Sequence, residues 1–284
     1  MKHFLRIFSM LLIAGASICL APPKLSAQQV GISVSLQVFY DQLSPYGHWM
    51  HYSGYDGYVW VPMVEVGFSP YSTRGHWRLT NAGWMWISDY SWGWAPFHYG
   101  RWDRDSRYGW IWIPDTHWGP AWVNWRSSNG YYGWSPMEPA RNAHHRDYNN
   151  RSDRFIFVSY KDFDRPDVNK YYIDKTKNVT IIKTSTVINN KHVDNSTHIT
   201  YNAGPRREDV QKATGKEIRE AAVEDNDKPG QNEQNDKVQI YKPRVKETDD
   251  NGKKPVPPKV SDKRTVEKDV KKNKTNAPAN NSNK

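Results

Sequence analysis

Carboxylates and histidines are the residues in the first half of the chain whose chemistry could serve catalysis. A glycosidase needs two carboxyl groups that face each other across a sugar. The carboxylates considered for this role are Asp89, Asp103, Asp105, Asp115 and Glu138. All five fall in or beside predicted turns, where such side chains bond the backbone. Because their spacing does not make any two converge, we name no catalytic acid or base and expect a protein that is not an enzyme.

Histidines of the same region could bind a metal, and they are His48, His51, His76, His98 and His117. His48 and His51 do not match a zinc signature, since residues three apart in a strand point to opposite faces. His48 and His76 hold equivalent positions in a repeat, but Arg101 and Asn124 take that position later, which is typical of a solvated polar site. The chain also has no nucleophile elbow, phosphate loop or dinucleotide fingerprint. We therefore predict no metal site and no cofactor.

The elements that must position these residues are rich in tryptophan. All 14 tryptophans lie between Trp49 and Trp134. A first Trp that follows His, Arg or Asn recurs four times, and a second Trp follows each one nine to eleven residues later. The successive pairs are Trp49 and Trp60, Trp77 and Trp86, Trp102 and Trp112, and Trp125 and Trp134. This spacing defines four imperfect copies of one unit.

Each unit has the pattern of a β-hairpin. Around the second Trp, aromatic residues alternate with aliphatic ones, which is the period of a strand. Glycine-containing turns separate the two halves, and prolines such as Pro62, Pro114 and Pro136 end the second strand. The sequence therefore predicts a mainly β fold: an antiparallel meander of about four hairpins that closes into a small barrel or sandwich.

The run from Trp92 to Trp102, followed by Gly109–Pro114, resembles a tryptophan-rich domain of unknown function found in exported bacterial proteins. It is similar in style to the WXXGXW-type repeats of envelope proteins. The resemblance continues through Trp118–Val123 to Gly133–Pro136. It implies an envelope protein, and it brings no catalytic residue, cofactor or ligand with it.

Fourteen tryptophans and many tyrosines are more ring surface than about a hundred residues can easily hide, so we expect some rings to be exposed. Exposed rings beside polar side chains are suited to sugars, to cations or to another protein chain. The candidate ligand-binding residues lie near predicted loops: Trp92, Trp94, Tyr99, Arg101, Trp118, Trp122 and Arg126. The expected partner is envelope polysaccharide or peptidoglycan. The alternative is a structural role in which the aromatic surface packs on an envelope protein, and a glycan-acting enzyme is a third reading.

The first 27 residues read as an export signal, with basic Lys2 and Arg6 before an apolar stretch and a cleavage site before Gln28. Acylation of Cys19, the only cysteine, is the alternative, although Ile18 stands where a small residue is wanted. We expect a bacterial protein of the periplasm or cell surface with no transmembrane segment in its mature chain. Basic residues gather in the second half and the tryptophans in the first, so we predict no nucleic-acid binding.

After Pro139 the pattern predicts a smaller β or α+β extension. Strands are expected at Phe155–Val158, 179–189 and Val238–Tyr241, a first helical turn is expected at Pro205, and a capping box at Thr214 is expected to start a helix over 218–223. From Lys246 the chain is polar without periodicity, which predicts disorder. The predicted division is 1–27 signal peptide, 28–39 lead-in, 40–140 Trp-rich repeat domain, 141–152 linker, 153–245 extension and 246–284 disordered basic tail.

Overall fold

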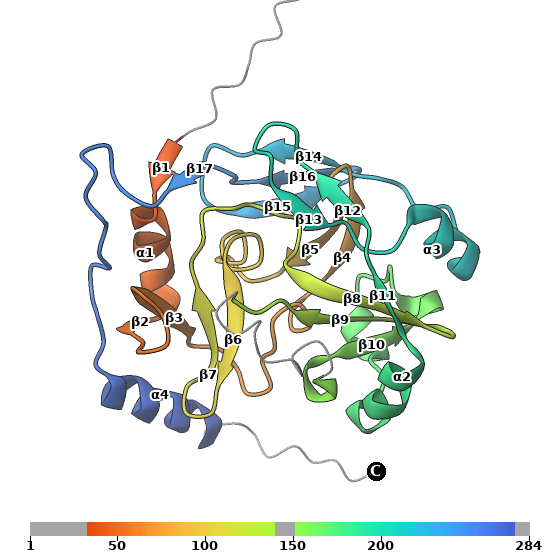
Figure 1. Ribbon diagram of the computed structural model, residues 1–284, viewed down its shortest axis with the longest axis horizontal. Coiled ribbons are helices and arrows are strands. Elements are labelled where there is room, and N and C mark those ends of the chain that lie inside the picture. The colour runs from red at the N-terminus through yellow and green to blue at the C-terminus, as the bar shows by residue number, and fades with distance from the viewer. Residues whose placement is uncertain (1–32, 140–150, 276–284) are drawn as a thin grey trace, which may run out of the picture. The chain divides into compact units, whose positions relative to one another are not determined.

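The structure is a computed structural model that describes residues 33–139 and 151–275 (Figure 1). The predicted signal peptide, the first five residues of the lead-in and nearly all of the predicted linker lie outside the described residues. Among the residues that it does describe, no helix is long and apolar enough to cross a membrane.

The four predicted hairpins are confirmed, and in each one the two tryptophans that set the repeat are directly opposite each other. The paired strands are β2 (Gly47–His51) with β3 (Tyr58–Pro62), β4 (Gly75–Thr80) with β5 (Gly83–Ser88), β6 (Arg101–Asp105) with β7 (Gly109–Ile113), and β8 (Val123–Ser128) with β9 (Tyr131–Pro136). At each turn a glycine has positive φ, which a hairpin connection favours: Gly57, Gly83, Gly109 and Gly130.

The hairpins do not continue into one another as a single meander. The first and third share a four-stranded sheet of order β2-β3-β7-β6, in which Trp60 lies opposite Trp112. The second hairpin, β4-β5, forms its own sheet. The fourth lies in a sheet of order β10-β9-β8-β11, with strands from the second half of the chain on both edges. The described strands therefore form several sheets, with the four hairpins divided among three of them, and no closed barrel.

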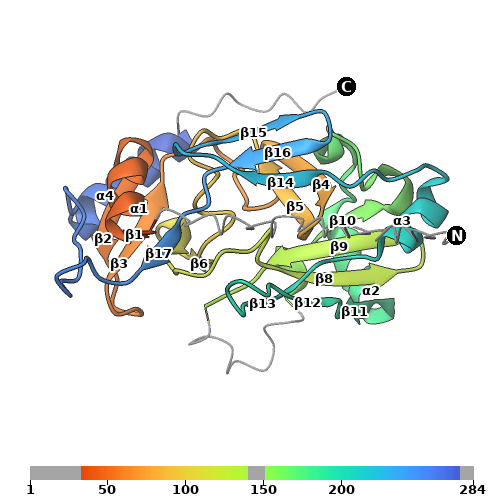
Figure 2. The same ribbon diagram turned by 90° about the horizontal axis from the view of Figure 1, so that it is seen from above.

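The second half is an α+β extension, as expected, but its element boundaries differ. Its elements are β10 (Ile156–Ser159), α2 (Asn178–Thr184), β11 (Thr186–Ile188), β12 (Lys191–Val193), β13 (Thr200–Asn202), α3 (Arg207–Thr214), β14 (Ala222–Asp225), β15 (Gln231–Gln234), β16 (Lys237–Ile240), β17 (Arg244–Lys246) and α4 (Lys263–Thr275). Strands β12 and β13 pair with each other, and β14, β16 and β15 form a sheet that Figures 1 and 2 show beside the β4-β5 hairpin.

Two sequence expectations for this half were wrong in detail. The strand expected over 179–189 begins as helix α2 and becomes strand β11 only at Thr186. A helix does begin near Pro205, as expected, and it is α3, which ends where Gly215 adopts the left-handed conformation. The second helix expected over 218–223 is not formed, since strand β14 begins at Ala222. The lead-in contains a short strand, β1 (Ser33–Ser35), that pairs in parallel with β17, followed by helix α1 (Gln37–Leu43).

The prediction of disorder from Lys246 is also wrong for residues 246–275. Helix α4 buries Val266 and Val270 against a small apolar cluster that includes Met50, Val59 and Ile111. Valines four residues apart share one face of a helix, and that face was too sparse to be recognised in a lysine-rich segment. Residues 276–284 lie outside the described part of the chain.

All fourteen tryptophans are buried, none more than 9% exposed. The expectation that some rings would be exposed holds for Tyr46, which is 40% exposed, but was wrong for the tryptophans, because it counted only the first half of the chain as cover. Trp84 donates its indole N–H to the Pro205 carbonyl (2.9 Å), and its ring packs edge-on against Phe163 at 4.6 Å. Trp94 packs edge-on against Tyr241 at 5.1 Å. The extension thus supplies both the surface and the hydrogen-bond acceptors that the aromatic block needs.

Candidate functional site

The predicted ligand-binding aromatics are part of the core. Trp92 is 5% exposed, Trp94 2%, Tyr99 0%, Trp118 8% and Trp122 5%. With their faces covered by protein, these rings do not offer a platform on which a sugar could stack. Trp92, for example, has Trp60 at 5.0 Å and Tyr90 stacked on it at 4.4 Å.

The structure brings some of these residues together around His98. The Trp122 indole donates to the His98 carbonyl at 3.0 Å, and the His98 ring stacks near Trp118 at 6.0 Å. The Arg101 guanidinium lies 3.5 Å from the centre of the Trp122 ring, so this cation is already occupied by an aromatic partner. Arg126 is placed elsewhere: its Nη1 donates to Ser185 Oγ at 3.0 Å beside helix α2.

Two of the carboxylates that the sequence left unassigned do converge. Glu138 forms an ion pair with Arg154, and Nη1 of Arg154 lies 3.8 Å from Oδ1 of Asp103. The Tyr55 hydroxyl donates to Asp103 at 2.9 Å. The two carboxyl groups therefore share Arg154 as a cationic neighbour, and this contact holds both side chains in place.

The repeat-equivalent histidines are not free, solvated positions. His48 pairs with Asp269 of helix α4 at 3.2 Å, and His76 pairs with Glu233 of strand β15 at 2.9 Å. The same position in two units therefore attaches two different C-terminal segments to the hairpins. Among the described residues, no three His, Cys, Asp or Glu side chains are grouped so that they could hold a metal ion.

The surface feature best suited to a ligand is a groove beneath the loop that joins β3 to β4, here called the loop groove. It consists of two hollows, of about 380 and 470 Å³. The hollows adjoin, because Gly67, Ser69 and Lys175 line both of them. One wall is the loop from Pro62 to Gly75, and the other includes residues between 153 and 175.

The loop that forms this wall is anchored on both sides. Phe68 is buried and packs on Trp102 at 5.6 Å, and the Tyr90 hydroxyl donates to Glu65 at 2.7 Å. The Tyr172 hydroxyl donates to the Ser72 carbonyl at 3.0 Å. The Asn273 amide of α4 donates to the Val64 carbonyl at 2.9 Å. These contacts make the wall a fixed part of the structure.

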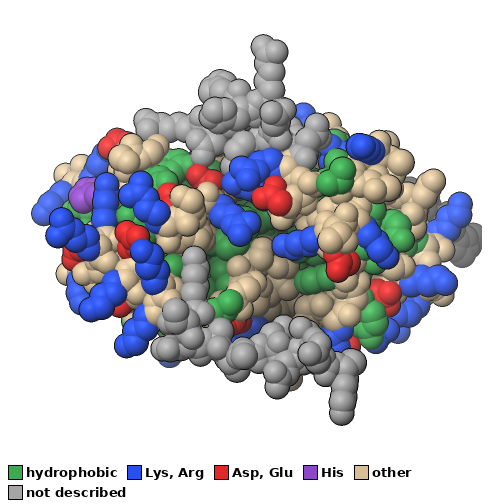
Figure 3. Space-filling view, turned by 90° about the horizontal axis from the view of Figure 1, so that it is seen from below, with side chains coloured by type: hydrophobic (Ala, Val, Ile, Leu, Met, Phe, Trp, Pro, Cys, Tyr) green, Lys and Arg blue, Asp and Glu red, His purple; other side chains and the backbone are tan. Residues whose placement is uncertain are grey.

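The two hollows of the loop groove differ in chemistry by degree. The first has the apolar side chains of Met63, Val66 and Trp110 beside several charged ones. The second is more polar, with Thr73, Arg74 and Asn169. The charged residues that line the two hollows are Glu65, Arg74, Asp89, Arg104, Asp153, Arg154 and Lys175. Figure 3, which views the molecule from below Figure 1, shows a hollowed face with lysine and arginine side chains around it.

Sequence reasoning missed the groove because its residues come from a loop without a motif and from a segment almost a hundred residues later. One signal was present. The loop between β3 and β4 is twelve residues long, from Met63 to Arg74, a length that the loop between β5 and β6 shares. Long ordered loops in compact domains are often functional.

Comparison with known proteins agrees with the class of protein that these features define, a tryptophan-rich β-hairpin domain. Residues 40–141 match the model of a family of unknown function, DUF6600. The match covers the four hairpins and ends near the last of them. No curated protein and no solved structure matches the chain.

Proposed function

We propose that this protein is a non-catalytic binding module of the bacterial cell envelope, and that it holds a linear glycan-like polymer in the loop groove. The observation that carries the proposal is that two neighbouring hollows share Gly67, Ser69 and Lys175 in their linings. Adjoining hollows lined by apolar side chains together with charged and hydrogen-bonding ones are suited to a chain of sugar units, which has both C–H faces and hydroxyl groups. The export expected from the first 27 residues would bring the module to such polymers.

The other readings have less support from the geometry. A protein partner packed on an aromatic surface would need exposed rings, and all fourteen tryptophans are buried. A glycan-acting enzyme would need two carboxyl groups open to a sugar. Asp103 and Glu138 are close to each other, but Arg154 pairs with Glu138 and lies near Asp103. We therefore propose binding without catalysis.

The test is binding of the purified protein to isolated peptidoglycan and to envelope polysaccharides, measured by co-sedimentation and calorimetry. Ser69 lies where the two hollows join, so Ser69→Trp should block the groove and weaken binding at least about tenfold, the effect of losing roughly 1.4 kcal/mol. Ser53→Trp is the matched control, because Ser53 is exposed in a turn outside the groove. Absence of binding to any of these polymers, or equal binding by Ser69→Trp, would overturn the proposal.

A further inference from the structure

Helix α4 is the most basic helix of the described chain, because six of its thirteen residues are lysine or arginine and two are acidic. Four of the basic residues are exposed, and each lies three or four positions from another: Arg264, Lys268, Lys271 and Lys272. Successive residues of a helix are about 100° apart, so these four lie within an arc of about 100°. We call them the basic stripe. Figure 3 shows lysine and arginine side chains gathered at its left, the side on which Figure 1 places α4.

The opposite face of α4 attaches the helix to the hairpins. Val266 and Val270 lie about 180° from the centre of the basic stripe. Both are buried in a cluster with residues of strands β2, β3 and β7. Beside this face, Asp269 pairs with His48 at 3.2 Å, and the Asn273 amide donates to a main-chain carbonyl of the loop after β3 at 2.9 Å. The basic stripe is therefore turned away from the protein.

The start of the helix is held in place as well. The Asp262 carboxylate accepts from the N–H groups of Arg264 and Thr265, each at 3.0 Å, and from the Thr265 hydroxyl at 2.6 Å. Such a cap supplies an acceptor to N–H groups that the first turn of a helix leaves unpaired. A ligand of the basic stripe therefore meets a preformed helix and does not have to order its backbone.

The positive charge of the basic stripe is only partly compensated by the helix itself. Glu267 pairs with Lys271 at 2.8 Å, and the other acidic residue of α4 faces His48. Among the residues that the structure describes, neither Arg264 nor Lys268 forms an ion pair. These two cations are one helical turn apart on the exposed face, so their charge is available to a partner.

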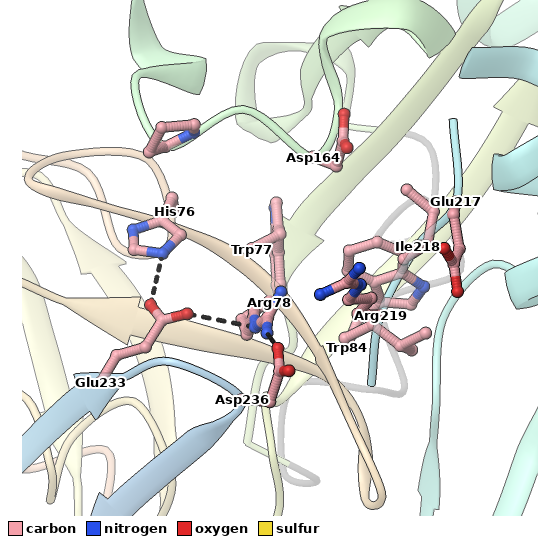
Figure 4. A pocket seen from close by; sticks show the side chains of 12 residues that line it. His76, Trp77, Arg78, Trp84, Asp164, Glu217, Ile218, Arg219, Glu233 and Asp236 are labelled. Carbon is pink, nitrogen blue, oxygen red and sulfur yellow. Dashed lines mark hydrogen bonds and ion pairs between the residues drawn. The ribbon is translucent and has the colours of Figure 1, made fainter. Parts of the chain in front are cut away.

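An arginine of strand β4 shows the opposite case. Arg78 lies beside a hollow of about 440 Å³, and its guanidinium pairs with Glu233 at 3.1 Å and with Asp236 at 2.9 Å (Figure 4). Its charge is met by the protein, so Arg78 holds strand β15 and the turn after it against β4. Arg264 and Lys268 have no such role in the fold.

The form of the basic stripe selects the kind of partner. Its cations follow one line, with a rise of about 6 Å from Arg264 to Lys268 and again from Lys268 to Lys272. A helix that lies on a membrane puts its apolar face into the bilayer, but the apolar face of α4 is buried against the hairpins. A linear polymer with one negative group in each unit matches a line of cations better than a plane of lipid headgroups does.

We propose that the basic stripe binds a linear acidic polysaccharide whose sugar units carry carboxylates. Arginine and lysine bind carboxylates through charge-assisted hydrogen bonds. Val270 of the opposite face lines the loop groove, so the basic stripe lies outside that groove. The site therefore goes beyond the proposed function, since it gives the protein a second, electrostatic contact with the polymers of the envelope.

The experiment compares an oligomer of galacturonic acid with the same oligomer after methyl esterification of its carboxyl groups, by calorimetry. The acid should bind at least about tenfold more tightly than the ester, since each cation near an anionic surface contributes on the order of 1 kcal/mol. Its affinity should also fall at least about tenfold when salt is raised from about 50 to 200 mM, because binding releases counterions of the polymer.

The double variant Arg264→Gln with Lys268→Gln should weaken binding of the acid at least about tenfold. Glutamine is a good helix former, and hydrogen exchange over residues 263–275 checks that α4 stays folded. Arg264→Lys with Lys268→Arg keeps the charge and should keep the affinity. Lys191→Gln with Lys216→Gln removes the same charge from two exposed positions on other elements and should leave the affinity within error.

Equal binding of acid and ester, or undiminished binding of the acid by the glutamine double variant, overturns the proposal. Vesicles of phosphatidylglycerol and phosphatidylcholine in equal parts test the membrane alternative. If the protein binds these vesicles through Arg264 and Lys268 and does not bind the acid, the partner is a membrane surface and the polysaccharide assignment is wrong.

Ser69→Trp separates this site from the loop groove. It should leave binding of the galacturonic acid oligomer unchanged. If Ser69→Trp abolishes that binding and the glutamine double variant does not, the acid lies in the loop groove and the basic stripe is not its site. Failure of isolated peptidoglycan and of neutral envelope polysaccharides to bind, with the acid still bound by the basic stripe, overturns only the proposed function of the loop groove.

Discussion

The hydroxyl of Tyr99 donates a 2.7 Å hydrogen bond to the main-chain carbonyl of Pro243, 144 residues further along the chain. Tyr99 is fully buried in the third repeat unit, and Pro243 lies between strands β16 and β17 of the extension. This bond shows how the two halves depend on each other. The aromatic block has too few acceptors and too little cover of its own, and the second half provides both.

Tyr99→Phe should therefore destabilise the protein. The substitution keeps the ring and leaves the buried Pro243 carbonyl without its donor, which costs about 1–3 kcal/mol. Urea unfolding monitored by tryptophan fluorescence measures the change. Tyr46→Phe is the control, because Tyr46 is 40% exposed, and its free energy of unfolding should stay within error of the wild type. Equal stability of both variants would show that the Tyr99 contact does not contribute.

Gly75→Ala should be more damaging than a glycine substitution at a turn. A Cβ on Gly75 would lie 2.4 Å from the Ile87 carbonyl oxygen and 2.8 Å from the Trp86 ring. The same contacts recur at Gly47 with Trp60 and at Gly100 with Trp112, so the repeat uses glycine to admit the indole.

We expect Gly75→Ala to lower the free energy of unfolding by about 3 kcal/mol or more, which is at the upper end of the cost of overpacking a core. The control is Gly109→Ala, where φ is +76° but a Cβ meets nothing within 4 Å. That variant should lose only about 1 kcal/mol from backbone strain. Thermal and urea unfolding of both proteins would check this order, and a smaller loss for Gly75→Ala would contradict it.

His98 should make stability depend on pH. Burial lowers the pKa of His98 to about 4, below the ordinary histidine value, so the unfolded chain binds the proton more readily. Its contribution to stability is present above about pH 6.5 and is lost as pH falls towards 4, by about 3 kcal/mol in total. The measurement is the free energy of unfolding of wild type and His98→Gln between pH 7 and 4. The difference between them should change over this range, and a constant difference would refute the assignment.

Val266→Asp should release helix α4. Val266 is fully buried in the cluster with Met50, Val59 and Ile111, and an unpaired carboxylate there is costly. We expect faster hydrogen exchange and proteolysis over residues 263–275, with the four hairpins still protected. Val256→Asp, at a residue that is 53% exposed, is the matched control and should behave like the wild type. If helix α4 keeps its protection from hydrogen exchange and proteolysis in Val266→Asp, then the packing of Val266 does not hold the helix in place.

The hairpins could be predicted from sequence because their determinants are local. Trp77 and Trp86 are nine residues apart with a turn between them, and the strand period and Gly83 fix their register. The pairing of tryptophans across each hairpin therefore needed no knowledge of the rest of the chain. Helix α4 was missed for the opposite reason, since the helix is held by packing against strands that are far away in the sequence.

The sequence by itself determined the four hairpins, the mainly β class and the segregation of aromatic from basic residues. Tertiary structure decided which tryptophan rings are accessible, and the answer was none, because Pro205, Tyr241 and Pro243 contact residues of the Trp-rich region. It also brought Lys175 and Ser69 into the lining of the same hollows. Hairpin register follows from neighbours in sequence, whereas burial and grooves depend on contacts between residues far apart in the chain, and no local pattern records those contacts.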